Sequence, residues 1–161
     1  MKKLCILISV LLFTTLFGVN GQSPKQSFKA GEDFLEKGKY TDAIEQYSKA
    51  IQTDAKFTKA YVQRGLAYSS LKNYKEAADD YERALVFEPK DPELYCWAAD
   101  MHFKLNADSL AFERVSKALY YKPNYIEAIQ LKVLILIDLN RYGEAAKESK
   151  NALKIKETAQ N

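Results

Sequence analysis

Lys59 to Pro89 reads KAYVQRGLAYSSLKNYKEAADDYERALVFEP, a pattern that predicts two short helices joined by a tight turn. The turn falls at Lys72-Asn73-Tyr74, between two segments rich in alanine and tyrosine. Pro89 ends the second helix, because proline has no backbone N–H to donate to the helix. The same pattern recurs along the chain at a step of 34 residues, which indicates an array of helical hairpins.

Small residues mark the repeat most clearly. Two alanine positions recur in every repeat and a third position is small in three of them: Ala43, Ala77, Ala111 and Ala145; Ala50, Ala84, Ala118 and Ala152; and Gly31, Gly65 and Ala99. Small side chains at facing positions let the two helices of a hairpin approach closely. Ala77 should therefore lie in this helix contact, whereas Ala78, one residue further round the helix, should turn toward solvent.

This pattern resembles the tetratricopeptide repeat. Four such repeats, at about residues 24–57, 58–91, 92–125 and 126–159, cover nearly all of the chain after its first 23 residues. The resemblance implies an all-α fold, a right-handed α-solenoid of four helix-turn-helix hairpins. We expect these hairpins to form one domain over residues 22–161.

Local signals indicate where several helices begin and end. Gly38 suits the end of the first helix of the first repeat, and Thr41 could cap the second helix. Asp91 followed by Pro92 predicts the start of a helix, because proline is favoured at the first helical position. Asp108 is expected to cap the second helix of the third repeat.

The N-terminus has the pattern of a secretory signal peptide. Lys2 and Lys3 precede an apolar run from Leu4 to Gly18, and Gly21 provides a small residue at a plausible cleavage site. We expect residues 1–21 to be removed, with an uncleaved N-terminal anchor as the alternative and the chain's only expected membrane contact. The arrangement resembles exported proteins of Gram-negative bacteria, so a periplasmic or secreted location is predicted.

Charge and motif content exclude several classes of function. The formal net charge is +3, and two of those charges come from the signal segment, so nothing indicates a basic surface for nucleic acid. The chain has no glycine-rich phosphate loop, no Cys/His spacing for a metal and no Ser–His–carboxylate set. We therefore expect no enzymatic activity, no metal and no cofactor.

Cys96 and His102 are the two residues whose chemistry could suggest otherwise. Cleavage would leave Cys96 as the only cysteine, and the two residues lie six positions apart, which places them on different helix faces. A reactive thiol is one interpretation of Cys96, but a small packed residue is the simpler one. His102 is interpreted as a packed core residue with one satisfied ring nitrogen.

The resemblance also implies a binding surface. In the family, the first helices of successive repeats line a concave groove, and the residues that face it recur at spacings of three and four. In this chain the corresponding face is Lys25, Phe28, Glu32 and Leu35, then Lys59, Val62, Leu66 and Ser69, then Glu93, Cys96, Asp100 and Phe103, and finally Glu127, Gln130, Leu134 and Ile137.

The mixture of apolar and charged residues on this face suits an extended peptide or a helix of a partner protein. The alternative is that Leu35, Phe103 and Ile137 seal neighbouring repeats against one another. The first position of the face is Lys25 in the first repeat and Glu127 in the last. A bound segment should therefore be apolar in the middle, acidic toward the first repeat and basic toward the fourth.

Some members of the family clamp the C-terminal carboxylate of a partner with Lys, Asn and Arg side chains. The matching positions of the first three repeats here hold Phe28, Glu32, Gln63, Glu93 and Trp97. Two carboxylates would repel that of the ligand, and no arginine is present to form a fork with it. We expect no such clamp.

The fourth repeat differs from the others. Tyr125–Leu139 reads YIEAIQLKVLILIDL and is apolar almost all the way round, so this helix needs cover on more than one side. Either it forms part of a partner-binding surface, or the third repeat and the last helix enclose it. Two functions remain open: a scaffold or adaptor that binds a protein or peptide in the groove, and a structural subunit of a cell-envelope complex that buries this helix surface.

Overall fold

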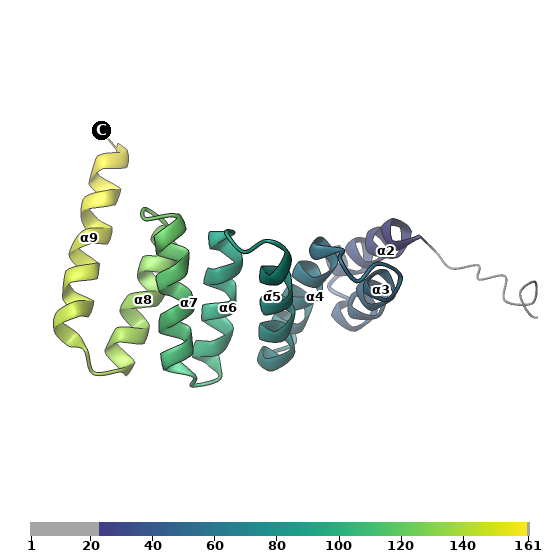
Figure 1. Cartoon of the computed structure of the whole chain (residues 1–161), viewed down its shortest axis with the longest axis horizontal. Coiled ribbons are helices and arrows are strands. Elements are labelled where there is room, and N and C mark those ends of the chain that lie inside the picture. Colours follow the sequence, from purple (N-terminus) through teal and green to yellow (C-terminus); the bar gives the residue numbers. More distant parts are fainter. Residues whose placement is uncertain (1–22, 161) are drawn as a thin grey trace, which may run out of the picture.

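The computed structural model describes residues 23–160, and this part of the chain folds into eight α-helices and contains no strand. The helices stand side by side in chain order (Figure 1). Their bounds are α2 (Pro24–Glu36), α3 (Tyr40–Thr53), α4 (Thr58–Ser70), α5 (Tyr74–Phe87), α6 (Pro92–Lys104), α7 (Asp108–Tyr121), α8 (Ile126–Asp138) and α9 (Tyr142–Gln160). The predicted signal peptide lies outside the described residues.

The helices pair as four hairpins, α2 with α3, α4 with α5, α6 with α7 and α8 with α9, as the 34-residue period predicts. Each hairpin packs on the next, so the fold is the expected right-handed α-solenoid. Nearly all contacts join helices that are neighbours in sequence, apart from a few between α2 and α4 and between α6 and α8. The stability of such an array is close to a sum of hairpins and of nearest-neighbour interfaces.

The same turn closes all four hairpins. Its central residue has a left-handed backbone at each repeat, with φ of 69° at Gly38, 62° at Lys72, 56° at Asn106 and 58° at Asn140. In the first hairpin the Lys39 N–H donates to the Phe34 carbonyl at 2.9 Å, and bonds of 2.8–2.9 Å recur at this position in the other three hairpins. This six-to-one bond identifies a Schellman motif at the end of every first helix.

This turn explains why two expected caps are absent. The second helices begin at the residue that immediately follows the turn, so Thr41 lies inside α3 and Asp108 is the first residue of α7. The cap positions are held by Lys39, Asn73 and Ala107, and none of them makes a side-chain capping bond. The connection is too short to hold a separate capping residue.

Two first helices, in contrast, begin with side-chain caps. Ser23 Oγ accepts from the Gln26 N–H at 3.2 Å, and Gln26 Oε1 accepts from the Ser23 N–H at 2.8 Å, which completes a capping box. Asp91 Oδ1 accepts from the Glu93 N–H at 2.8 Å, with Pro92 at the first helical position as predicted.

Glycine and tyrosine set the spacing of the first two hairpins. A Cβ atom on Gly31 would lie 2.5 Å from Tyr47 Cε1, and one on Gly65 would lie 2.9 Å from Tyr81 Cε1. The tyrosine ring of the second helix therefore occupies the space where any larger residue would project from the first helix. The two helices approach closely at these glycines as predicted, but the side chain that meets each glycine is a tyrosine and not the alanine expected from the sequence.

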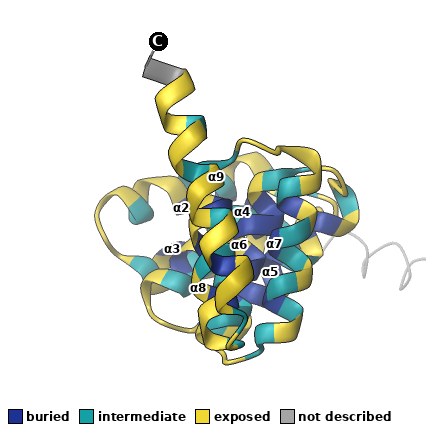
Figure 2. Ribbon diagram, turned by 90° about the vertical axis from the view of Figure 1, so that its left-hand side faces the viewer, coloured by how far each residue is buried: buried dark blue, intermediate teal, exposed yellow. Residues whose placement is uncertain are grey.

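The prediction that Ala78 turns toward solvent is wrong. Ala77 is 0% exposed and Ala78 only 2%. Both are buried because α5 packs against α4 of its own hairpin on one side and against α6 of the next repeat on the other. Figure 2, which looks along the array from its α9 end, shows the buried residues gathered inside the array and α9 exposed over much of its length.

His102 lies in a polar cluster and is partly exposed, so the interpretation as a core residue is only partly right. Its Nε2 lies 3.0 Å from Glu82 Oε1, and the Arg114 Nε–H donates to the same oxygen at 2.6 Å. Burial would raise the pKa of Glu82, but the hydrogen bonds from His102 and Arg114 lower it below its usual value. The cluster joins α5, α6 and α7, so it ties the third repeat to the second.

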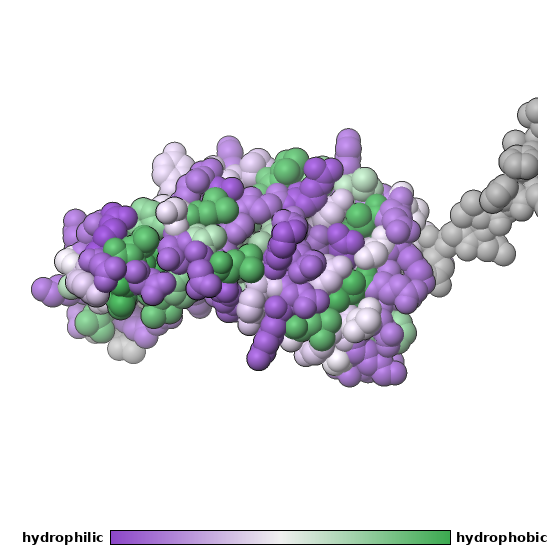
Figure 3. All heavy atoms as spheres, turned by 90° about the horizontal axis from the view of Figure 1, so that it is seen from below, coloured by the Kyte–Doolittle hydropathy of each residue, from purple (hydrophilic) through white to green (hydrophobic). Residues whose placement is uncertain are grey.

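None of the helices in residues 23–160 is long and apolar enough to cross a membrane. On the face displayed in Figure 3, hydrophobic side chains form separate patches between hydrophilic ones.

Replacing Lys72 with glycine should stabilise the protein. Lys72 is exposed and has a φ of 62°, which costs a side chain other than glycine about 1 kcal/mol or more. After the backbone entropy of glycine is subtracted, we expect Lys72→Gly to raise the melting temperature by about 2 °C. Thermal unfolding followed by circular dichroism measures this. A lower melting temperature would contradict the role of strain at this turn.

Replacing Asp80 with alanine should strongly destabilise the protein. Asp80 is buried and accepts two hydrogen bonds from the Arg64 guanidinium, at 2.7 and 2.8 Å. Its loss leaves a half-buried arginine without its carboxylate, which we expect to cost about 3 kcal/mol in the free energy of unfolding. Asp79→Ala is the matched control, because Asp79 is exposed and pairs only with Lys75 at 3.7 Å. Urea denaturation measures the free energy of unfolding of both variants. Equal decreases in the two variants would contradict the expected contribution of the buried ion pair.

Candidate functional site

Three hollows follow the first helices along the array. The first, about 360 Å³, lies between α2 and α4, the second, about 270 Å³, between α4 and α6, and the third, about 370 Å³, between α6 and α8. Val62 and Gln63 line both the first and the second hollow, and Trp97 and Asp100 line both the second and the third. The three hollows therefore form one continuous surface, which we call the groove.

Most of the residues predicted for this face line the groove. They come from all four repeats: Phe28, Glu32, Lys59, Val62, Leu66, Ser69, Cys96, Asp100, Glu127, Gln130 and Leu134. The spacing of three and four along the first helices thus selects one side of the array, as the period of the helix requires.

The other five predicted residues do not line these hollows. Phe103 packs against the hydrophobic core, which agrees with the alternative that it seals neighbouring repeats. Leu35 is half-buried, whereas Ile137 is 47% exposed. Lys25 and Glu93 lie in the first turns of α2 and α6, where both side chains are exposed.

Cys96 is buried at the edge of the third hollow. Burial raises the pKa of its thiol to about 11, and a hydrogen bond with Tyr125 only partly offsets that effect. A thiol with such a pKa carries almost no thiolate near neutral pH. The interpretation of Cys96 as a packing residue therefore holds.

Trp97 is the main residue of the groove that the predicted set omits. It is 38% exposed, it lines two of the three hollows, and its ring lies 5.7 Å from that of Tyr81. Trp97 stands 34 residues after Gln63, which also lines two hollows. A second row of residues, one position after Val62 and Cys96, could have identified both side chains from the sequence.

The complete lining of the groove is more acidic than its first positions indicate. Lys59 shares the first hollow with Glu32 and with Glu88, which lies just beyond the end of α5. The third hollow contains Asp100 and Glu127. Acidic residues thus outnumber the basic one along the three hollows, and the expected contrast between a basic and an acidic end is weakened.

Glu93 also weakens the predicted contrast between a basic and an acidic end of the groove. Its carboxylate lies 3.5 Å from Lys122 Nζ, so a residue beyond the end of α7 partly neutralises it. The charges that alter the predicted charge pattern come from residues that follow the second helices. The prediction considered only one face of the first helices, so it did not include them. In the described part of the chain, no group of three or more His, Cys, Asp or Glu residues is placed to hold a metal ion.

Comparisons with known proteins agree with this architecture. Residues 31–72 match a family model described as TPR repeat, and residues 58–91 match the model of the tetratricopeptide repeat. The chain therefore carries tetratricopeptide repeats and has the fold of that family.

Solved structures with the same fold include a crystal structure of MamA, with a TM-score of 0.83 and 23% identity over 92% of this chain and 86% of that one. YrrB, described as a TPR protein with an unusual peptide-binding site, gives a TM-score of 0.76 and 22% identity over 89% of this chain and 74% of that one. The first TPR of Spaghetti (RPAP3), bound to the HSP90 peptide SRMEEVD, gives a TM-score of 0.70 and 24% identity over 77% of this chain and 98% of that one.

Among curated proteins, Hsp70-Hsp90 organizing protein 2 of Arabidopsis thaliana is 29% identical over 99 residues, which are 62% of this chain and 17% of that protein. A DnaJ homolog subfamily C member 7 homolog of Dictyostelium discoideum is 30% identical over 122 residues, 68% of this chain and 23% of that protein. The chain thus spans less than a quarter of the length of these two relatives.

The buried position of Cys96 predicts a slow reaction with thiol reagents. In a variant with Cys5 replaced by serine, we expect the native protein to react with DTNB at pH 8 at least about a hundredfold more slowly than the urea-unfolded protein. Absorbance of the released thionitrobenzoate measures both rates. Similar rates in the two states would show that the thiol is accessible and reactive.

Proposed function

We propose that this chain is a non-enzymatic adaptor that binds a peptide or a helix of a partner protein in its groove. The observation that carries the proposal is the continuity of the three hollows along α2, α4, α6 and α8. Two relatives of the same fold are described as binding peptides, which supports a peptide or protein as the partner.

The lining of the groove indicates the chemistry of that partner. Val62, Leu66 and Trp97 give the middle of the groove an apolar surface, and Leu66 is 46% exposed. Exposed aromatic and aliphatic side chains of this kind commonly dominate binding energy at an interface. Because acidic residues surround this apolar region, the bound segment should carry apolar anchors and basic residues on either side of them.

The same lining argues against a ligand that ends in an acidic motif. Glu32 lies in the first hollow together with Glu88, and the positions that match the carboxylate clamp of the family contain no arginine. Like charges within one Debye length repel each other at physiological ionic strength. We therefore propose a different peptide class from the HSP90 peptide named for the RPAP3 structure.

For the location, we propose an exported protein, periplasmic or secreted, whose residues 1–21 are a cleaved signal peptide. The alternative function is a structural subunit of a cell-envelope complex. The exposed apolar side chains of α8, Leu134 and Ile137, favour that alternative, because an obligate interface would cover them.

The test is a selection of random displayed peptides on the purified protein, followed by affinity measurement for the enriched sequences. We expect enrichment of peptides with aromatic or aliphatic residues next to Lys or Arg. Trp97→Ala and Leu66→Ala should each weaken binding of such a peptide by at least about tenfold.

Tyr120→Ala is the matched control, because Tyr120 is 78% exposed on α7 and does not line the groove. It should leave the affinity unchanged. If folded Trp97→Ala and Leu66→Ala proteins bind the selected peptides as well as the parent protein does, the groove is not the binding site.

A further inference from the structure

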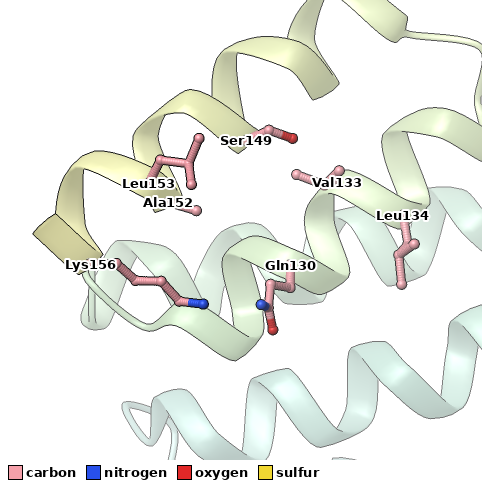
Figure 4. A pocket seen from close by; sticks show the side chains of 7 residues that line it. All are labelled: Gln130, Val133, Leu134, Ser149, Ala152, Leu153 and Lys156. Carbon is pink, nitrogen blue, oxygen red and sulfur yellow. The ribbon is translucent and has the colours of Figure 1, made fainter.

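The C-terminal end of the array carries a fourth hollow, which is larger than any of the three in the groove. It measures about 570 Å³ and lies between α8 and α9 (Figure 4). Val133 of α8 points toward α9, whose residues Ser149, Ala152 and Leu153 line the opposite side. The hollow borders the groove at Leu134 but lies beyond α8, which is the first helix of the fourth hairpin.

The 34-residue period shows what this hollow corresponds to. One repeat earlier, the positions of Val133 and Ala152 are held by Ala99 and Ala118, both fully buried in the core. There, α8 packs against α7 and α6 and covers them. The hollow is therefore the place where the first helix of a following repeat would pack.

At this end of the array, apolar residues remain uncovered. Leu134 is 53% exposed and Leu153 is 61% exposed. Leu119, which holds the position of Leu153 one repeat earlier, is partly buried against the core. No element within residues 23–160 covers the side of α8 and α9 that carries the hollow.

We infer that this end of the array docks an amphipathic helix of another protein, which takes the position of a fifth first helix. This surface adjoins the proposed groove, with which it shares Gln130 and Leu134, but its remaining lining residues lie outside the groove. It gives the chain a second binding site, which takes a helix in the position of a further repeat.

The helix that occupies the equivalent place one repeat earlier provides a template for the partner. The residues of α8 that belong to the core cluster with α6 and α7 are Ala128, Leu131 and Ile135, with Tyr125 partly buried at the start of the helix. Their spacings of three and four place them on one helical face. A docked helix should therefore present an aromatic residue at its start and a small residue and two aliphatic residues along the same face.

A lysine lies near the start of α8, and the equivalent position at the end of the array is also a lysine. Lys122 Nζ lies 4.4 Å from the centre of the Tyr125 ring, an attractive cation–π contact. Lys156 holds the corresponding position at the end of the array and extends toward Gln130 in the hollow (Figure 4). An aromatic residue at the N-terminus of the partner helix would find the same contact there.

Charge further defines the partner. Lys150 and Lys154 lie on α9, three residues before and one residue after Leu153. Glu148 already pairs with Lys132 at 2.7 Å. Lys150, Lys154 and Lys156 thus make α9 basic around Leu153, which favours a partner helix with acidic residues on its flanks.

A second copy of the chain fits this site poorly. The first described helix of such a copy, α2, would present Gln26 and Asp33 where α4 buries Ala60 and Ala67. Lys25 and Lys29 of α2 would also add positive charge beside the basic α9. The partner is therefore a different protein.

The test uses a fluorescent helical peptide of 18 residues that carries Tyr, Ala, Leu and Ile at the spacing of Tyr125, Ala128, Leu131 and Ile135, with glutamates on its flanks. Fluorescence anisotropy with the purified protein should show saturable binding. Leu153→Asp should weaken it at least about tenfold, since Leu153 is central to the hollow and too exposed to be needed for folding. Lys156→Glu should weaken it about threefold at low ionic strength.

Two controls separate this site from the groove and from simple apolar adhesion. Trp97→Ala should leave the affinity for the peptide unchanged, whereas it weakens binding in the groove. A peptide of the same composition in scrambled order should not bind. Loss of binding in Trp97→Ala, equal binding of the scrambled peptide, or no binding of the designed peptide would each overturn the inference. So would a dimer in sedimentation velocity that Leu153→Asp dissociates, because the occupant would then be a second copy.

Discussion

The contact between a glycine of the first helix and a tyrosine of the second is the interaction on which the first two hairpins and the centre of the groove depend. At Gly65 a Cβ would lie 2.9 Å from the Tyr81 ring, so the distance between α4 and α5 is fixed by the thickness of that ring. The same ring lies 5.7 Å from Trp97 of the following repeat. One buried side chain thus sets a hairpin, joins it to the next hairpin and supports the aromatic residue at the centre of the groove.

Along the chain, the larger residue of this contact changes from the second helix of the hairpin to the first. The first two repeats pair Gly with Tyr, the third has Ala99 and Val115, and the fourth has Val133 and Ser149. In the third repeat both residues are fully buried. In the fourth repeat both Val133 and Ser149 line the hollow between α8 and α9.

The period of the sequence was sufficient to predict the helices, their pairing and the side of the array that forms the groove. Periodicity reports contacts within one hairpin well, because those contacts recur at a constant step. It does not report contacts that a neighbouring repeat adds. Ala78 is buried on α5, which packs between α4 and α6, so its assignment to solvent was wrong. Phe103 packs against the core, in agreement with the alternative that it seals neighbouring repeats.

Two further features depended on geometry that the residues of one helix do not show. The charge of the groove is altered by Glu88 and Lys122, which follow the ends of second helices. The expected caps at Thr41 and Asp108 were wrong because a Schellman turn already satisfies the end of the first helix and leads directly into the second. Trp97 could have been identified, since it repeats the position of Gln63.

Each hollow of the groove lies at a joint between two successive hairpins. Such an array bends chiefly at these joints, since its helices make few contacts beyond their immediate neighbours. A segment that fills all three hollows would contact all four hairpins and restrict bending between them. If the groove binds such a segment as proposed, its affinity would include an entropic cost of stiffening, and a change that rigidifies any single joint would alter the binding of the whole segment.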